Sequence, residues 1–339
     1  MKRKLQLGVG LALLGAACAP DVTRTAPVVS AEDAVSGHFT HPAGTINTTT
    51  PLGGRPFGLA VSSEDVVYVT LADEGRVQRF DLPSFTPGPS VAVGSIPTGV
   101  AFRRNAKTAW VTNQFSNTVS VIDVATDQQI RTIPVDHHPV VVIAGPDGET
   151  VYVSDNVGDV FAFDVETDRL VATMTFSSLV NGFVLHPDGQ LLYASQVFNG
   201  TVSEINTQTN TVARNFPIGG STLQGVAVSR DGDELYVADE GSDVLRVVDI
   251  ASGAEIATVP LGGGGFGVAL SPDNAQVYVS LSQGGPGCQS GGCVKVVDRA
   301  SRAVVNTIET HGTPRRLGFS VIGETAVIAN ENGWVDFVR

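Results

Sequence analysis

A short apolar motif, repeated seven times along the 339-residue chain, constrains the fold more than any other feature. Four copies read Val-Tyr-Val or Leu-Tyr-Val, and the other three are close variants of the same apolar run. The second residues of successive copies lie 41 to 43 residues apart, except for a last interval of 49. The copies occupy residues 67–70, 109–112, 151–154, 192–195, 235–238, 277–280 and 326–329. A sustained period of this length is typical of repeat architectures such as propellers and solenoids.

Each copy contains four strand-like pieces separated by turns. An apolar segment such as residues 225–229 comes first, and a tight turn such as Pro146-Asp147-Gly148 leads into the motif. A third segment ends in Asp or Asn, as at Asp123, and a fourth such as residues 129–133 leads to the next copy. No window has the 3.6-residue period of an amphipathic helix. The sequence therefore predicts an all-β, seven-bladed β-propeller with four antiparallel strands per blade.

The two ends of the repeat region complement each other. The seventh copy ends at Arg339 after its third strand, whereas residues 46–54 look like an isolated fourth strand, similar in ending to residues 259–263. We predict that this N-terminal segment pairs with residues 333–338 and completes the last blade. Such pairing closes the ring and removes two exposed sheet edges.

The segment from Trp110 to Asp123, Trp-Val-Thr-Asn-Gln-Phe-Ser-Asn-Thr-Val-Ser-Val-Ile-Asp, resembles the defining segment of the YVTN-type β-propeller repeat family of exported bacterial and archaeal proteins. The resemblance extends in outline over residues 46–339, and the copies at 193–196 and 327–330 depart from it most. It implies a seven-bladed propeller and an exported location. It implies little about activity.

The N-terminus has the composition of a targeting segment. Lys2, Arg3 and Lys4 precede an apolar run at residues 5–14 that is too short to span a bilayer comfortably. The following Gly-Ala-Ala-Cys sequence resembles a bacterial lipoprotein signal, which predicts a signal peptide over residues 1–18 and lipidation of Cys18. The match has Leu14 four residues before the cysteine rather than three. The alternative is a secretory signal cleaved nearby.

These features predict the organisation and location of the chain. We expect a flexible tether over residues 19–37, rich in Pro, Ala and Ser, and a propeller over residues 38–339. We expect a periplasmic or cell-envelope protein, anchored to a membrane only through its lipid and otherwise secreted. In an oxidising compartment Cys288 and Cys293 would form a disulfide, because no third cysteine or histidine lies nearby to complete a metal site.

The charge balance restricts the partners. The chain has 21 Lys and Arg against 34 Asp and Glu, a net charge of −13. Nucleic-acid binding relies on basic surfaces that neutralise phosphates, so a nucleic-acid partner is not expected. We expect a monomer whose partner is a protein, a polymer or a small molecule of the cell envelope.

Candidate ligand-binding residues lie in the loops between blades and in the loops between second and third strands, which share one face of a propeller. They are Arg55, His137, Asp155, Asn181, Gln224, Asp239 and Arg315. Arg55 and Arg315 could clamp a carboxylate or phosphate, and Asn181 and Asp239 are weak candidates for binding calcium. His137 and His138 should not share a site, because neighbours in an extended segment point in opposite directions. The alternative is that all of these are solvated loop residues, which any propeller carries.

Three functions are consistent with this sequence. The first is an exported binding module that presents its polar ring to a partner protein, envelope polymer or small ligand. The second is a lactonase-like hydrolase, with or without calcium, at the same face. The third is an accessory subunit of a periplasmic redox or transport system. No catalytic constellation can be assigned, which favours the binding module.

Overall fold

The structure is a computed structural model that describes residues 44–288, 291–321 and 324–339. The predicted signal peptide (1–18), the lipidation site Cys18, the tether (19–37) and residues 38–43 of the predicted propeller lie outside the described residues. In the described part, no helix is both long enough and apolar enough to cross a membrane.

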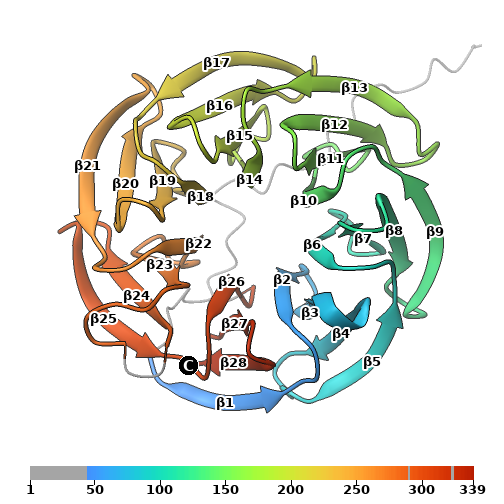
Figure 1. Cartoon of the computed structure of the whole chain (residues 1–339), viewed down its shortest axis with the longest axis horizontal. Coiled ribbons are helices and arrows are strands. Elements are labelled where there is room, and N and C mark those ends of the chain that lie inside the picture. Colours follow the sequence, from blue (N-terminus) through green and yellow to red (C-terminus); the bar gives the residue numbers. More distant parts are fainter. Residues whose placement is uncertain (1–43, 289–290, 322–323) are drawn as a thin grey trace, which may run out of the picture. The chain divides into compact units, whose positions relative to one another are not determined.

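The described strands form seven separate four-stranded antiparallel sheets, which confirms the predicted propeller (Figure 1). The first strands of the blades are β2 (Pro56–Val61), β6 (Pro97–Phe102), β10 (Pro139–Ala144), β14 (Val180–Leu185), β18 (Leu223–Val228), β22 (Gly265–Leu270) and β26 (Pro314–Phe319). The second strands are β3 (Val66–Leu71), β7 (Thr108–Asn113), β11 (Thr150–Asp155), β15 (Leu191–Gln196), β19 (Glu234–Asp239), β23 (Gln276–Leu281) and β27 (Ala326–Asn330).

The outer half of each blade follows the same order. The third strands are β4 (Arg76–Asp81), β8 (Thr118–Asp123), β12 (Asp159–Asp164), β16 (Thr201–Asn206), β20 (Val244–Asp249), β24 (Cys293–Asp298) and β28 (Trp334–Val338). The fourth strands are β5 (Pro87–Ala92), β9 (Gln128–Pro134), β13 (Leu170–Thr175), β17 (Thr211–Pro217), β21 (Ala254–Pro260), β25 (Ala303–Glu309) and, in the seventh blade, β1 (Ile46–Pro51). One 3-10 turn, η1 (Ala72–Glu74), follows β3.

The blades follow one another around a ring. Each first strand contacts the first strands of the two neighbouring blades, including β26 with β2 where the ring closes (Figure 1). The repeated apolar motif forms the second strands, and all six residues of β3 are buried. Apolar side chains fill the space between blades, as where Trp110 and Val121 of the second blade pack with Val153 and Phe163 of the third. Fourth strands such as β9 are mostly exposed. The continuous apolar character of the motif therefore reflects burial on both faces of the sheet.

The N-terminal strand closes the ring as predicted. β1 pairs with β28 in antiparallel register, with Thr49 opposite Asp336 and Pro51 opposite Trp334. The phenyl rings of Phe80 in the first blade and Phe337 in the seventh lie 5.4 Å apart, so the closing interface is also packed by side chains.

Glycine recurs at the third residue of the first strand because this strand approaches the next blade closely. A Cβ atom on Gly267 would lie 2.3 Å from the carbonyl oxygen of Arg315, and one on Gly58 would lie 2.4 Å from that of Thr98. Five blades have glycine at this position, Gly58, Gly99, Gly182, Gly225 and Gly267. The third blade has Val141 and the seventh has Arg316. Arginine is thus an exception at a position where the fold favours the smallest residue.

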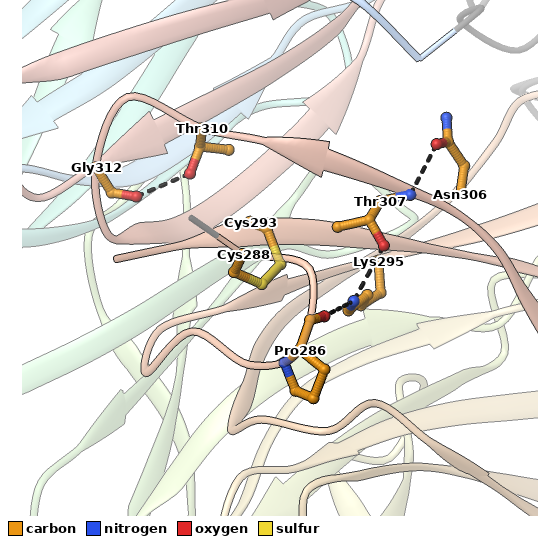
Figure 2. The surroundings of a disulfide bond; sticks show 8 residues. All are labelled: Pro286, Cys288, Cys293, Lys295, Asn306, Thr307, Thr310 and Gly312. Carbon is orange, nitrogen blue, oxygen red and sulfur yellow. Dashed lines mark hydrogen bonds between the residues drawn. A yellow bond between two sulfur atoms is a disulfide. The ribbon is translucent and has the colours of Figure 1, made fainter. Parts of the chain in front are cut away.

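The predicted disulfide joins Cys288 and Cys293, whose Cα atoms lie 5.3 Å apart (Figure 2). Next to it, the buried ammonium of Lys295 donates hydrogen bonds to the carbonyl oxygen of Pro286 at 2.7 Å and to Thr307 Oγ1 at 3.0 Å (Figure 2). Burial lowers the pKa of this lysine. The lysine and the disulfide together fasten the loop that precedes β24 to the outer part of the sixth blade.

Candidate functional site

The predicted loops meet on one face of the ring. The Asn113 carboxamide accepts a hydrogen bond from the amide of Gly94 at 3.0 Å, and Asn332 accepts one from the amide of Thr313 at 2.6 Å. Each contact joins a loop between blades to the end of a second strand or to the loop that follows it. Candidate residues pair in the same way, Arg55 with Asp73 and His137 with Asp155, which places them on this face.

Arg55 and Arg315 converge on one carboxylate. Glu331 Oε2 lies 2.7 Å from Nη2 of Arg315, and Glu331 Oε1 lies 3.4 Å from Nη1 of Arg55. Arg55 Nε also lies 3.3 Å from Asp73 Oδ1. The two predicted anion clamps are thus brought together, but each already has a carboxylate within the protein. Glu331 was not among the candidates named from the sequence.

Two phenylalanine rings, Phe57 and Phe266, lie beside Arg315 and Arg316. The guanidinium carbon of Arg315 is 4.7 Å from the ring centroid of Phe266, and that of Arg316 is 5.1 Å from the same centroid. Phe57 packs edge-on against Phe266, with centroids 5.9 Å apart. Aromatic faces attract the cations and hold their flat side chains in fixed orientations.

Arg316 reaches from the seventh blade to the fourth. Its Nη2 donates hydrogen bonds to the carbonyl oxygen of Asn181 at 2.7 Å and to Asn181 Oδ1 at 3.2 Å. β26 and β14 belong to blades that are not neighbours and face each other across the centre of the ring (Figure 1). Burial, and then the neighbouring charge of Arg315, lower the pKa of Arg316 to about 10, so it remains a cation at neutral pH. No carboxylate of the described residues pairs with it.

Asn181 and Gln224 belong to a connected chain of polar groups. The Asn181 amide donates to Gln224 Oε1, Gln224 Nε2 donates to Glu240 Oε2 at 2.7 Å, and Ser282 Oγ donates to Glu240 Oε1 at 2.8 Å. Asn181 and Gln224 are each 7% exposed, so they are not solvated loop residues. Because the oxygens of Asn181 already accept hydrogen bonds from Arg316, a calcium ion there would compete with a fixed positive charge.

Asp239 lies in a separate network. Its Oδ2 accepts hydrogen bonds from Arg246 Nη2 at 2.8 Å and Nε at 3.0 Å, and its Oδ1 accepts one from the amide of Thr222 at 3.2 Å. Burial disfavours ionisation of Asp239, but hydrogen bonds, including those from Ser242 and Arg246, outweigh it and lower the pKa. This carboxylate, which is fully buried, holds the loop before β18 in place.

His137 and Asp155 are the remaining two of the candidate ligand-binding residues. His137 Nδ1 lies 3.7 Å from Asp155 Oδ2, and burial raises the pKa of Asp155. His138 is directed elsewhere, with Nδ1 2.8 Å from the carbonyl oxygen of Gln114. The two histidines occupy different sites, as expected, but for a different reason. The segment is not extended, since both residues have left-handed backbones with φ of 55° and 48°.

A cavity of about 140 Å³ lies at the centre of the ring and is lined by first strands. Its wall combines the guanidinium of Arg316 with apolar groups of Leu59, Val142 and Phe183. A larger hollow of about 410 Å³ is lined by turns of the fifth and sixth blades. Its arginines, Arg299 and Arg302, both pair with Glu234, at 3.0 and 2.9 Å, and Arg299 also pairs with Asp231 at 3.1 Å. Two carboxylates therefore balance the two positive charges.

The candidates predicted from the sequence did not include Arg316, Glu240, Glu331 or Asp159. A signal for Arg316 was present, because aligning the seven copies shows an arginine where five copies have glycine. The two glutamates carry no such signal, since acidic residues are common in surface loops.

Comparison with known proteins supports the architecture. The chain is 25% identical over 273 residues to the uncharacterized protein YncE of Salmonella typhimurium, covering 75% of this chain and 74% of that protein. It is 26% identical over 298 residues to the seven-bladed beta-propeller protein Rv1057 of Mycobacterium tuberculosis, covering 73% of this chain and 74% of that protein. No family model matches the chain.

A solved structure has the same fold. A chain of hydrazine synthase from Kuenenia stuttgartiensis superposes with a TM-score of 0.75 at 21% identity, covering 88% of this chain and 99% of that one. At this identity the likeness concerns the fold alone. The chain described here is therefore a seven-bladed β-propeller protein that is distantly related to YncE and Rv1057.

Proposed function

We propose that this protein is a binding module that holds a small oxyanion, a carboxylate or a phosphate group, at Arg316 in the centre of the ring. One observation carries the proposal. Arg316 occupies a position that is glycine in five blades, and no carboxylate of the described residues pairs with its charge. An arginine that is partly buried without an anionic partner costs desolvation energy, which a bound anion would offset.

The hydrogen bonds of Arg316 leave donors for a ligand. Nη2 is the nitrogen that donates to Asn181, and neither Nε nor Nη1 donates to any described residue. Nε and Nη1 can each donate to an oxygen of a carboxylate or phosphate, and the charge of the guanidinium strengthens these hydrogen bonds. Asn181, itself held by Gln224, fixes the orientation of the guanidinium in advance.

The cavity limits the size of the ligand. Its volume of about 140 Å³ is well below the roughly 300 Å³ at which pockets for drug-sized molecules begin. Leu59, Val142 and Phe183 add an apolar wall. Inorganic phosphate or a short-chain carboxylate fits this combination of one cation and apolar surface.

The wider setting of the proposal is the cell envelope. We propose that the chain is an exported YVTN-type propeller, anchored through Cys18 or secreted. The targeting pattern at residues 2–18 and the family resemblance support this. The Cys288–Cys293 disulfide also supports it, because disulfides persist in oxidising compartments.

Isothermal titration calorimetry with phosphate, sulfate, acetate and succinate tests the proposal. The informative variant is Arg316→Gly, which installs the residue that five blades already tolerate at this position. Arg104→Gln is the matched control, because Arg104 is an exposed arginine bonded to the carbonyl oxygen of Pro146 in a turn between first and second strands. We expect saturable binding of at least one oxyanion, lost in Arg316→Gly and kept in Arg104→Gln.

Two results would reject the proposal. Equal binding by the parent protein and Arg316→Gly would show that the arginine is not the ligand-binding group. Hydrolysis of lactones by the parent protein, lost when Arg55 or Arg315 is replaced, would favour the hydrolase alternative over a binding module.

A further inference from the structure

We infer that His137, Asp155 and Asp159 form a binding site for a divalent transition-metal ion of the zinc type. Each residue offers one ligand atom, and these atoms all lie within 4.8 Å of one another. His137 comes from the loop between the second and third blades, and Asp155 and Asp159 are the last residue of β11 and the first residue of β12. The inference does not depend on the oxyanion site at Arg316.

Asp155 supplies the strongest evidence. Its Oδ1 accepts hydrogen bonds from the amides of Val157, Gly158 and Asp159 at 3.0, 2.8 and 2.8 Å, so this oxygen is fully used. Its Oδ2 is buried, accepts no hydrogen bond from the described residues and lies 3.7 Å from His137 Nδ1. The side chain of Asp155 is 0% exposed. A buried carboxylate oxygen without a partner is costly, and a bound cation removes that cost.

Asp159 repeats this situation. Its Oδ1 is also buried and without a hydrogen bond from the described residues, although its amide donates to Asp155. The turn that joins the two aspartates is tight. Gly158 has a φ of 110°, and a Cβ atom there would lie 2.7 Å from the carbonyl oxygen of Phe176. The two carboxylates are therefore held in a fixed relation by the backbone.

His137 can complete the site by a small rotation. Its side chain is 61% exposed and so is free to turn. Ligand atoms bonded to one zinc ion at about 2.1 Å must lie within about 4.2 Å of one another. The ligand atoms lie at most 4.8 Å apart, so only a small movement is needed to meet this limit.

The types of ligand atom select the class of metal. One imidazole nitrogen and two carboxylate oxygens suit Zn²⁺ and its transition-metal neighbours, whereas Ca²⁺ requires about six to eight oxygens. Three protein ligands leave a further coordination position. Because His137 is exposed, that position faces solvent and could accept water or an external carboxylate.

The experiment is calorimetric titration of the tag-free protein with ZnCl₂, with CaCl₂ and MgCl₂ in parallel. Co²⁺ absorbance reports the coordination geometry. The test variants are His137→Gln and Asp159→Asn. The matched control is His311→Gln, because His311 also lies beside an aspartate, with Nδ1 2.8 Å from Asp336 Oδ1, but does not belong to the three-ligand cluster.

We expect one Zn²⁺ per chain, with affinity reduced about tenfold or more in either test variant and unchanged in the control. Absence of saturable Zn²⁺ binding, tighter binding of Ca²⁺ than of Zn²⁺, or equal losses in His137→Gln and His311→Gln would each overturn the inference. If Asp159→Asn fails to fold, His137→Gln decides alone, because an exposed side chain can be changed without disturbing the core. The Arg316→Gly variant should bind Zn²⁺ normally, so failure of the oxyanion proposal and failure of this one can be told apart.

Discussion

The guanidinium of Arg316 in the seventh blade donates a hydrogen bond of 2.7 Å to the carbonyl oxygen of Asn181 in the fourth. The contact joins two blades that share no sheet and are not adjacent in the ring. A single long side chain thus crosses the centre from a position where the other six first strands have glycine or valine. We therefore predict that ligand binding in the central cavity depends on Arg316.

Phosphate or sulfate should stabilise the parent protein more than it stabilises the Arg316→Gly variant. A ligand that binds only the native state stabilises it by RT ln(1 + [L]/Kd), about 2.7 kcal/mol at a hundredfold excess over Kd. These anions also stabilise proteins in general by exclusion from the surface. The measured quantity is therefore the difference in Tm shift between the two proteins, by scanning calorimetry. Identical shifts would mean that exclusion alone accounts for the effect.

Replacing Gly267 by alanine should destabilise the ring where the sixth blade meets the seventh. The new Cβ atom would lie 2.3 Å from the carbonyl oxygen of Arg315, and main chain cannot move aside as a side chain can. We expect a loss of about 1–3 kcal/mol in the free energy of unfolding, measured with denaturant. Gly88→Ala is the control, because its Cβ atom would meet its neighbours at an ordinary 3.6 Å. Similar losses in both variants would contradict the proposed close approach.

The five tyrosines of the chain should resist ionisation while the protein is folded. Tyr68, Tyr152, Tyr193, Tyr236 and Tyr278 are 0–2% exposed, and burial raises the pKa of each well above its ordinary value near 10. Because the folded pKa values exceed the unfolded ones, the associated stability is present below pH of about 10 and is lost as pH rises further. Ultraviolet absorbance of the phenolate should therefore appear together with unfolding. Ionisation of a folded protein near the ordinary pKa would refute this.

The turns between third and fourth strands should contribute to acid sensitivity. At Asp123, hydrogen bonds from the hydroxyl and amide of Thr126, at 2.7 and 2.8 Å, lower the pKa. Asp164, Asp249 and Asp298 are held in the same way by a Thr or Ser three residues later. Lowered folded pKa values give stability that is present above the ordinary carboxyl pKa of about 4 and lost as pH falls through the folded values.

Thr126→Val tests this turn directly. The variant keeps the shape of the side chain but removes the hydroxyl, so the pKa of Asp123 should rise toward its ordinary value. Carbon-13 NMR titration of the carboxyl groups measures the change, with Asp164 as an internal reference. An unchanged Asp123 pKa would show that the amide of Thr126 alone is responsible.

The fold could be predicted because its signals repeat. Seven copies of one apolar motif, with turn residues at fixed offsets from it, predict the same local structure seven times. The same pattern identifies β1 as the missing fourth strand of the last blade. The partners of polar residues could not be predicted in this way. Asp239 and Arg246 lie on strands within one blade, but nothing in the sequence distinguishes a structural ion pair from two free ligands. Arg316 and Asn181 are 135 residues apart, and only the closed ring brings them together.

The pairing of β1 with β28 gives the molecule an order of assembly. Among the strands of the described residues, β1 is synthesised first and its sheet partner β28 last, so the seventh blade can form only when Trp334–Val338 has been synthesised. Until then β1 has no sheet partner, and β26 and β27 form only a two-stranded hairpin. The entropy lost on joining such distant segments grows only slowly with their separation, so this late step adds modestly to the cost of closing the ring. Shortening the chain by its last strand would leave two unsatisfied sheet edges in place of a closed circle.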